Sequence, residues 1–256
     1  PLLPYKIKSA DLKCGVIKMY RENFYEVMDA CRPPVSALVI PKNSGLKGYA
    51  WHVLKEAGLE LKKARKVSRT TLRLFGIDII MARGEDIPQI VEDEFRVGRI
   101  TLGVTGDDLF DEYRLRNPDN KLRLENTYDW NDPKARYRRP AMCLINRTGK
   151  VRDIPKEAKV AVNGKYWVTA RLYLAKSPLV KRRQFDIGIF TGDLEDRVKR
   201  GTYDCCIDTV YTGKTIDEMD LKIVDEVRFS DLVVISSLGK DEKGLMEKLG
   251  KEIKRK

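Results

Sequence analysis

The chain has 256 residues, with 50 Lys and Arg against 38 Asp and Glu and a formal net charge of +12. That length allows either one large α/β unit or two lobes of roughly 100 residues each. The positive charge favours acidic partners such as nucleotides, polyphosphates, nucleic acid or an anionic subunit.

The cysteine and histidine content argues against several kinds of site. Five cysteines, an odd number without a repeated spacing, argue against a disulfide framework and for a reducing compartment. The single histidine, His52, falls in an amphipathic helical pattern, so we expect neither a Cys/His zinc cluster nor a Ser-His-Asp triad. No apolar run approaches the roughly 20 residues that span a bilayer, and no signal-peptide core is present, so we expect a soluble cytoplasmic protein.

The first part of the chain predicts an α/β fold behind an N-terminal extension. Residues 1–34 form that extension, which ends at the helix-breaking pair Pro33-Pro34. Strands and helices are then expected in alternation, which predicts a mostly parallel sheet. They are a strand at 35–40, a helix at 46–57, strands at 59–65, 70–75 and 78–82, a helix at 86–94, and a strand at 100–104. We expect Asp86 to be the cap of its helix rather than a ligand group.

The alternation of strands and helices stops between residues 113 and 140, where eight Lys or Arg stand against four acids with Tyr128, Trp130 and Tyr137 interleaved. We interpret this stretch as an excursion or a lid. The α/β alternation then resumes with strands at 141–146, 159–162 and 185–190, helices at 169–175 and 193–200, strands at 224–227 and 232–235, and an exposed helix from Gly239.

The stretch from Cys205 to Ile216 carries the strongest site signal. An apolar run with β-branched residues predicts a strand that ends in Thr212-Gly213-Lys214-Thr215. A glycine lets the backbone approach an anion, and a turn that opens a helix points N–H groups at it. A phosphate site is therefore one interpretation and an ordinary turn the other. Position 208 is an aspartate where a P-loop needs glycine, which excludes that motif.

Three more motifs accompany this loop in a fixed order. They are VLKEAGLEL at 53–61, R-x-x-D-I-P at 83–88 and G-V-T-G-D-D at 103–108. Together with D-x-V-x-T-G-x-T at 208–215, they resemble the ATP phosphoribosyltransferases that open histidine biosynthesis, over residues 36–236. Lys165-Tyr166 and the pair Gly192 and Glu195 are weaker matches to further elements of that family.

The resemblance implies an α/β, two-lobed fold like the type II periplasmic binding proteins, with a ligand cleft between the lobes. Residues 35–107 and 231–256 would form a discontinuous first lobe. Residues 108–230 would form the second lobe, which carries the phosphoribosyl-binding loop. The chain would be a divergent short form without the regulatory C-terminal domain. We therefore expect a homodimer, or an assembly with a regulatory subunit related to histidyl-tRNA synthetase.

The resemblance also implies a reaction, in which N1 of ATP attacks C1 of phosphoribosyl pyrophosphate and pyrophosphate leaves with substrate-bound Mg²⁺. Asp208 and Lys214 would be the catalytic residues. Phosphoribosyl pyrophosphate would be bound by Asp208, Thr209, Val210, Tyr211, Thr212, Gly213, Lys214 and Thr215. Lys42, Arg83, Asp108, Lys165 and Glu195 would contact ATP and phosphates. No metal ligand is expected from the protein's side chains.

Two other functions remain open from the sequence. One is a non-catalytic or repurposed phosphosugar- or nucleotide-binding protein on the same scaffold, because Asn43-Ser44-Gly45-Leu46 lacks an arginine that the family carries there. The other is nucleic-acid binding through the basic stretch at 113–140 and the basic tail. Since such charge runs are usually solvated faces, we expect no nucleic-acid partner and no membrane association.

Overall fold

The computed structural model describes residues 36–42, 46–51, 71–74 and 77–237. The N-terminal extension, the strand expected at 59–65 and the helix expected from Gly239 lie outside these residues, as do His52, Cys14 and Cys31. Residues 46–51 are helical, in agreement with the start of the helix expected at 46–57.

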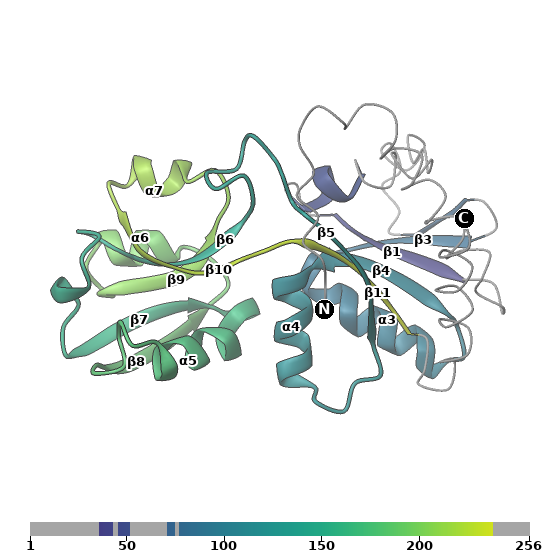
Figure 1. Ribbon diagram of the computed structural model, residues 1–256, viewed down its shortest axis with the longest axis horizontal. Helices are drawn as coiled ribbons and strands as arrows, with labels where there is room; N and C mark the ends of the chain where they lie inside the picture. The colour runs from purple at the N-terminus through teal and green to yellow at the C-terminus, as the bar shows by residue number, and fades with distance from the viewer. Residues whose placement is uncertain (1–35, 43–45, 52–70, 75–76, 238–256) are drawn as a thin grey trace, which may run out of the picture.

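The first lobe is built on a six-stranded sheet in the order β2-β3-β1-β4-β11-β5 (Figure 1). Its strands are β1 (Ala37–Pro41), β2 (Thr71–Leu74), β3 (Ile77–Ala82), β4 (Thr101–Gly106), β5 (Arg123–Tyr128) and β11 (Leu232–Ser236). Besides the helical residues 46–51, its described helices are the short η2 (Gly84–Asp86), α3 (Ile87–Arg96) and α4 (Asp107–Arg116). Helix α3 packs directly on β4, because Gly103 has no side chain to hold it off: a Cβ there would lie 2.7 Å from Val91 Cγ2.

The second lobe is built on a five-stranded sheet in the order β10-β6-β9-β7-β8. Its strands are β6 (Ala141–Asn146), β7 (Glu157–Asn163), β8 (Gln184–Phe190), β9 (Cys205–Val210) and β10 (Lys222–Phe229). Its helices are η3 (Val151–Asp153), η4 (Gly164–Tyr166), α5 (Trp167–Lys176), α6 (Leu194–Lys199) and α7 (Lys214–Glu218). The two-lobed α/β fold expected from the resemblance is confirmed.

The expectation of a mostly parallel sheet is wrong for both lobes. Strands β3, β1 and β4 are parallel, and so are β8, β7 and β9. The remaining strands pair antiparallel: β2, β11 and β5 in the first sheet, and β6 and β10 in the second. Each sheet is therefore mixed, with a parallel core whose carboxyl ends meet at one edge.

The chain crosses between the sheets twice. Strand β5 belongs to the first sheet, where it pairs with β11, and the chain enters the second sheet only at β6. The boundary expected after residue 107 therefore precedes the change of sheet, because both α4 and β5 follow it in the chain. The return crossing lies between β10 and β11, next to the boundary expected at residues 230 and 231.

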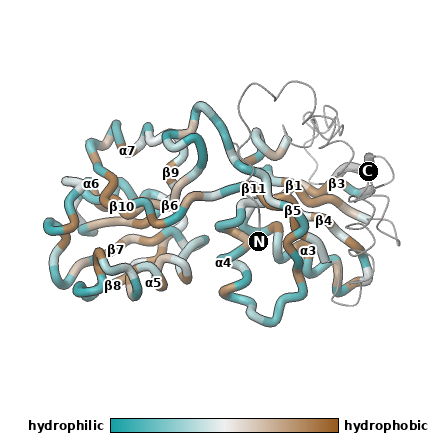
Figure 2. Tube along the Cα trace, in the orientation of Figure 1, coloured by the Kyte–Doolittle hydropathy of each residue, from teal (hydrophilic) through white to brown (hydrophobic). Residues whose placement is uncertain are grey.

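Alternating side chains of the second sheet build two cores. The apolar residues of its strands appear in brown in Figure 2. Met142, Leu144, Val160 and Ile207 face the layer that holds α5, and Cys143 and Cys206 face the layer that holds α6 and α7. The first of these clusters also takes in Leu109 of α4, so a helix from the first lobe contributes to the core of the second. Another cluster joins α3 to the first sheet through Val39, Ile87, Val91 and Ile235.

Candidate functional site

The carboxyl ends of β7, β8 and β9 meet at one edge of the second sheet. Asn163 at the end of β7 is in register with Phe190 at the end of β8, and Val162 is in register with Ile207 of β9. The segments that follow these strands carry Lys165, Glu195 and the loop from Tyr211 to Thr215. In open α/β sheets such an edge is where ligands bind.

The loop after β9 turns sharply into α7. Gly213 has φ of +79°, a conformation that costs a residue with a Cβ about 1–2 kcal/mol. The Lys214 N–H donates to Thr212 Oγ1 at 3.3 Å, and the Lys214 ammonium lies 3.4 Å from Glu218. Thr212, Lys214 and Thr215 are exposed, so two hydroxyls and an ammonium are open to a ligand.

Asp208 lies in β9 beside the loop and is held by two donors. Asn163 Nδ2 donates to Asp208 Oδ1 at 3.0 Å, and the Thr209 N–H donates to the same oxygen at 2.7 Å. Burial raises the pKa of Asp208, against the opposing effects of the Thr209 N–H, the Lys165 ammonium and Asn163. The net result is a desolvated carboxylate, a form that gains from any further hydrogen-bond donor that a ligand brings.

Glu195 lies close enough to Asp208 for the two charges to interact. Burial raises the pKa of Glu195 first, and the negative charge of Asp208 raises it further. Glu195 sits in the first turn of α6, after Asp193 at φ of +58°. The structure thus brings Asp208, Lys165 and Glu195 to the same edge of the second sheet.

Lys42 and Arg83 belong to the corresponding edge of the first sheet. Pro41 and Ala82 are in register at the ends of the parallel strands β1 and β3, and the Lys42 N–H donates to Ala82 O at 2.7 Å. Both basic residues are exposed. Asp86 follows them at the N-cap of α3, but its side chain makes no capping hydrogen bond, so the expected capping role is wrong.

Asp108 connects the two lobes. It lies in the first turn of α4 in the first lobe, is 4% exposed, and accepts a 2.7 Å hydrogen bond from the Tyr166 hydroxyl of the second lobe. Burial, together with the Asp108 charge, raises the pKa of Tyr166, so the phenol stays protonated as a donor. With its carboxylate engaged in this way, Asp108 is a structural bridge between the lobes.

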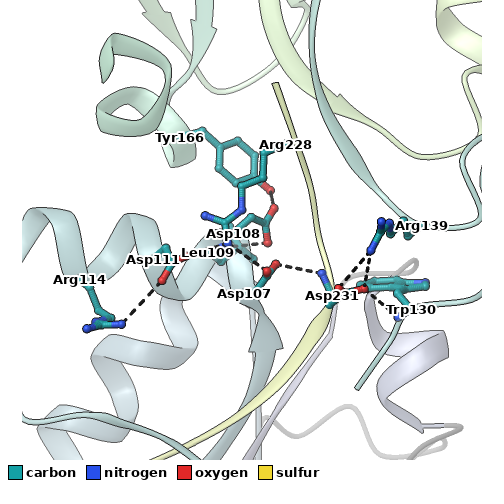
Figure 3. A network of polar contacts seen from close by, with 10 residues as sticks. All are labelled: Asp107, Asp108, Leu109, Asp111, Arg114, Trp130, Arg139, Tyr166, Arg228 and Asp231. Atoms are coloured by element: carbon teal, nitrogen blue, oxygen red, sulfur yellow. Dashed lines mark hydrogen bonds and ion pairs between the residues drawn. The ribbon is translucent and has the colours of Figure 1, made fainter. Parts of the chain in front are cut away.

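A network of charges surrounds the start of α4, as Figure 3 shows. Arg228 of β10 pairs with Asp107 at 3.0 Å and with Asp111 at 2.7 Å. Asp107 Oδ1 accepts the Asp231 N–H at 2.9 Å, and Asp231 in turn pairs with Arg139 at 3.3 Å. Both crossings between the lobes are therefore tied to the amino end of α4.

The sequence did not reveal several residues that hold this site. Asn163 and Tyr166 contact Asp208 and Asp108 across 45 and 58 residues of chain. Arg136, from the basic stretch, lies against Gly213. The sequence offered two signals, the weak family match at Lys165-Tyr166 and the place of Arg136 in a basic run, and neither predicts the partner of the side chain.

No group of three or more His, Cys, Asp or Glu side chains is placed to hold a metal ion in the part of the chain that the structure describes. None of the helices described is long and apolar enough to cross a membrane.

Comparison with known proteins gives a family match. Residues 83–255 match the sequence model of the ATP phosphoribosyltransferase family. The ATP phosphoribosyltransferase of Sulfurisphaera tokodaii is 32% identical over 162 residues, which are 63% of this chain and 50% of that protein. That of Metallosphaera sedula is 28% identical over 78% of this chain and 64% of its own length. The chain thus spans half to about two thirds of the length of these relatives.

A shorter relative and two solved structures extend the comparison. The ATP phosphoribosyltransferase of Rubrobacter xylanophilus is 26% identical over 84% of this chain and 95% of its own length. The ATP phosphoribosyl transferase (HisG:HisZ) complex from Thermotoga maritima superposes with a TM-score of 0.60 at 22% identity, over 86% of this chain and 95% of that one. A periplasmic sulfonate-binding protein from Methylobacillus flagellatus gives a TM-score of 0.52 at 16% identity, over 80% of this chain and 61% of that one.

Proposed function

Because the chain belongs to the ATP phosphoribosyltransferase family, we propose that it condenses ATP with phosphoribosyl pyrophosphate to give phosphoribosyl-ATP and pyrophosphate. A bond forms between N1 of ATP and C1 of the ribose, while the C1–O bond to pyrophosphate breaks and its electron pair leaves with the pyrophosphate. The observation that carries the proposal is the convergence of Asp208, Lys165 and the Thr212–Thr215 loop at one strand edge.

The loop after β9 is the proposed site of the 5-phosphate. Its turn at Gly213 leads into α7, and the exposed Lys214 ammonium and the two threonine hydroxyls offer a positive charge and hydrogen-bond donors. Val210 and Tyr211 position the loop: Val210 is buried in the core below it, and the Tyr211 carbonyl accepts the Arg136 N–H. A phosphate held here would fix the ribose relative to the sheet edge.

Asp208 is the proposed ligand of the ribose hydroxyls. Its desolvated carboxylate lacks the hydration that it would have in water, and two ribose hydroxyls would supply donors in its place. As the C1–O bond breaks, the ribose ring gains positive charge, which a nearby carboxylate stabilises more than it stabilises the ground state. Asp208 thus has a binding and an electrostatic role.

Cationic side chains are the proposed contacts for the remaining phosphates. Lys165 on the second lobe and Lys42 and Arg83 on the first lie after strands at the two sheet edges. Mg²⁺ would enter with the pyrophosphate as part of the substrate, which lowers the charge that these cations must neutralise. Asp108, which is bonded to Tyr166, would keep the lobes together rather than touch substrate.

Assembly with a regulatory subunit belongs to the same proposal, since the Thermotoga maritima relative was solved as a HisG:HisZ complex. We expect this chain to form a homodimer or to join a subunit related to histidyl-tRNA synthetase, and to act in the cytoplasm, where its substrates are made. Co-elution with such a subunit in size-exclusion chromatography would test this part.

The activity is tested by incubating the protein with ATP, phosphoribosyl pyrophosphate and Mg²⁺ and separating the nucleotides by chromatography. We expect a product with the mass of phosphoribosyl-ATP, formed in equal amount to pyrophosphate. The assay is repeated with a regulatory subunit added. Tight binding of phosphoribosyl pyrophosphate without product in either case would indicate a binding protein instead of an enzyme.

A further inference from the structure

The segment that carries the chain from β5 to β6, residues 129–139, is docked on the loop after β9. The Arg136 N–H donates to Tyr211 O at 2.7 Å, and the Tyr211 hydroxyl donates to Asp132. Trp130 meets the Tyr211 ring edge-on with centroids 6.1 Å apart. This crossing segment is therefore part of the surroundings of the proposed phosphate site.

The Arg136 guanidinium lies directly against Gly213. A Cβ built on Gly213 would be 2.7 Å from Arg136 Nη1 and 3.0 Å from Arg136 Cδ. No side chain at position 213 separates the guanidinium from the loop backbone. The approach follows from the sheet, because β6 pairs antiparallel with β9 and Ala141 is in register with Val210, so the residues before β6 lie beside those after β9.

Arg136 is held in this place by a carboxylate of α7, the helix that follows the loop. Its Nη1 donates to the two oxygens of Asp217 at 3.0 and 3.2 Å. The side chains are 39% and 64% exposed, so the pair is open to solvent. An exposed ion pair contributes little stability, about 0–1 kcal/mol, and a stronger anion can replace the carboxylate.

We propose that Arg136 is a ligand of the 5-phosphate, an inference that rests on the function proposed above. In the free protein the Asp217 carboxylate holds the guanidinium in position, and the bound phosphate replaces that carboxylate. The guanidinium presents a planar set of N–H donors that fits two phosphate oxygens, and a phosphate carries more charge than a carboxylate. The loop from Thr212 to Thr215 contains one cation, Lys214. Arg136 would then supply a second cation from the crossing segment.

Substitutions of the two residues of this ion pair should change the affinity for the phosphate in opposite directions. Ribose 5-phosphate is titrated into the full chain by calorimetry. Arg136→Gln should weaken its binding about tenfold, the usual loss for one charged hydrogen-bonded contact. Asp217→Asn should strengthen binding about threefold, because it removes a competitor for the guanidinium and a repulsive charge. A merely structural ion pair would make both substitutions weaken binding.

Matched controls separate this effect from a change of net charge. Arg138→Gln removes the same charge from an exposed residue of the same segment, and Asp220→Asn removes a carboxylate that pairs with Lys222 at 2.8 Å. Each should change the affinity by less than about twofold. Arg136→Lys, which keeps the charge but loses the fork of donors, should fall between the wild type and Arg136→Gln. If Arg136→Gln fails to fold, this lysine variant carries the test.

The outcomes distinguish the two proposals. If the folded wild-type chain binds neither ribose 5-phosphate nor phosphoribosyl pyrophosphate, the proposed function fails and the role of Arg136 fails with it. If the wild type binds and Arg136→Gln binds equally well, or if Asp217→Asn weakens binding as Arg136→Gln does, only the role of Arg136 is overturned.

Discussion

The carboxylate of Glu112 caps a helix of the opposite lobe: its Oε2 accepts the Thr169 N–H at 2.9 Å and the Thr169 hydroxyl at 2.7 Å. Its Oε1 accepts the Val168 N–H at 2.9 Å and lies 2.8 Å from the Arg116 guanidinium. Glu112 and Arg116 belong to α4 of the first lobe, and Val168 and Thr169 to the first turn of α5 in the second. One buried carboxylate thus satisfies two N–H groups that a helix leaves open.

Removal of this cap should destabilise the protein. Glu112→Gln places an amide NH₂ against one of two N–H donors, so we expect a loss of about 2–3 kcal/mol in the free energy of unfolding. Chemical denaturation followed by circular dichroism measures it. Asp119→Asn, at an exposed position, should change the value by less than about 0.5 kcal/mol. Equal stability of the two variants would show that the lobes do not depend on the cap.

Gly213→Ala should damage the phosphate loop. Alanine at φ of +79° is strained by about 1–2 kcal/mol, and its methyl group would meet Arg136 Nη1 at 2.7 Å. We expect lower stability and weaker binding of phosphoribosyl pyrophosphate, measured by thermal unfolding and by calorimetry. Gly192→Ala is the control, because a Cβ at Gly192 meets nothing within 4 Å. If both alanine variants bind as the wild type does, the loop conformation is irrelevant to the ligand.

Asp208→Asn should stabilise the ligand-free protein while it weakens ligand binding. Burial raises the pKa of Asp208, so the folded state holds its proton more tightly than the unfolded state does. That contribution is present below the unfolded value of 3.8 and is lost as the pH rises through the folded pKa. At pH 7 the buried, ionised carboxylate therefore lowers the free energy of unfolding. Asparagine carries no charge, and its Oδ1 can still accept hydrogen bonds from Asn163 and Thr209.

This prediction is checked by thermal unfolding of both proteins between pH 4 and pH 8. The midpoint of Asp208→Asn should exceed that of the wild type at neutral pH, and the difference should shrink towards pH 4. A variant that is less stable at every pH would contradict the assigned burial cost.

Three cysteines should be unreactive in the folded protein. Burial raises the pKa of Cys143 and of Cys205 to about 12, and it raises the pKa of Cys206 well above its usual value. Since the thiolate is the nucleophile, iodoacetamide at pH 8 should leave all three unmodified until denaturant is added. Peptide mass spectrometry after labelling gives the result, and modification of Cys206 in the folded state would contradict its burial.

The sequence predicted most strands because buried runs such as Ala141–Asn146 and Leu232–Ser236 are continuous and apolar. It failed for α4 and β5. Helix α4 buries Asp108 and Glu112 against polar groups of the other lobe, so its pattern is not apolar on the buried side. Strand β5 is an edge strand with exposed polar residues, which hid it within a basic stretch.

The candidate site was predictable only where it depends on local sequence. The turn after β9 is determined by residues that are adjacent in the sequence, so the motif Thr212-Gly213-Lys214-Thr215 predicted it directly. Asn163 and Arg136 reach Asp208 and Gly213 only through the pairing of β9 with β7 and β6, and strand pairing is not encoded by any local pattern. Long-range contacts of this kind required the fold.

The most direct test of the account is the initial rate of phosphoribosyl-ATP formation for the wild type and for Lys214→Glu, with any required regulatory subunit present. A glutamate here sets a negative charge against the 5-phosphate, so we expect at least a hundredfold loss in kcat/KM for phosphoribosyl pyrophosphate. Lys199→Glu, at the exposed end of α6, should retain activity. No product from the wild type, or equal rates for wild type and Lys214→Glu, would contradict the account.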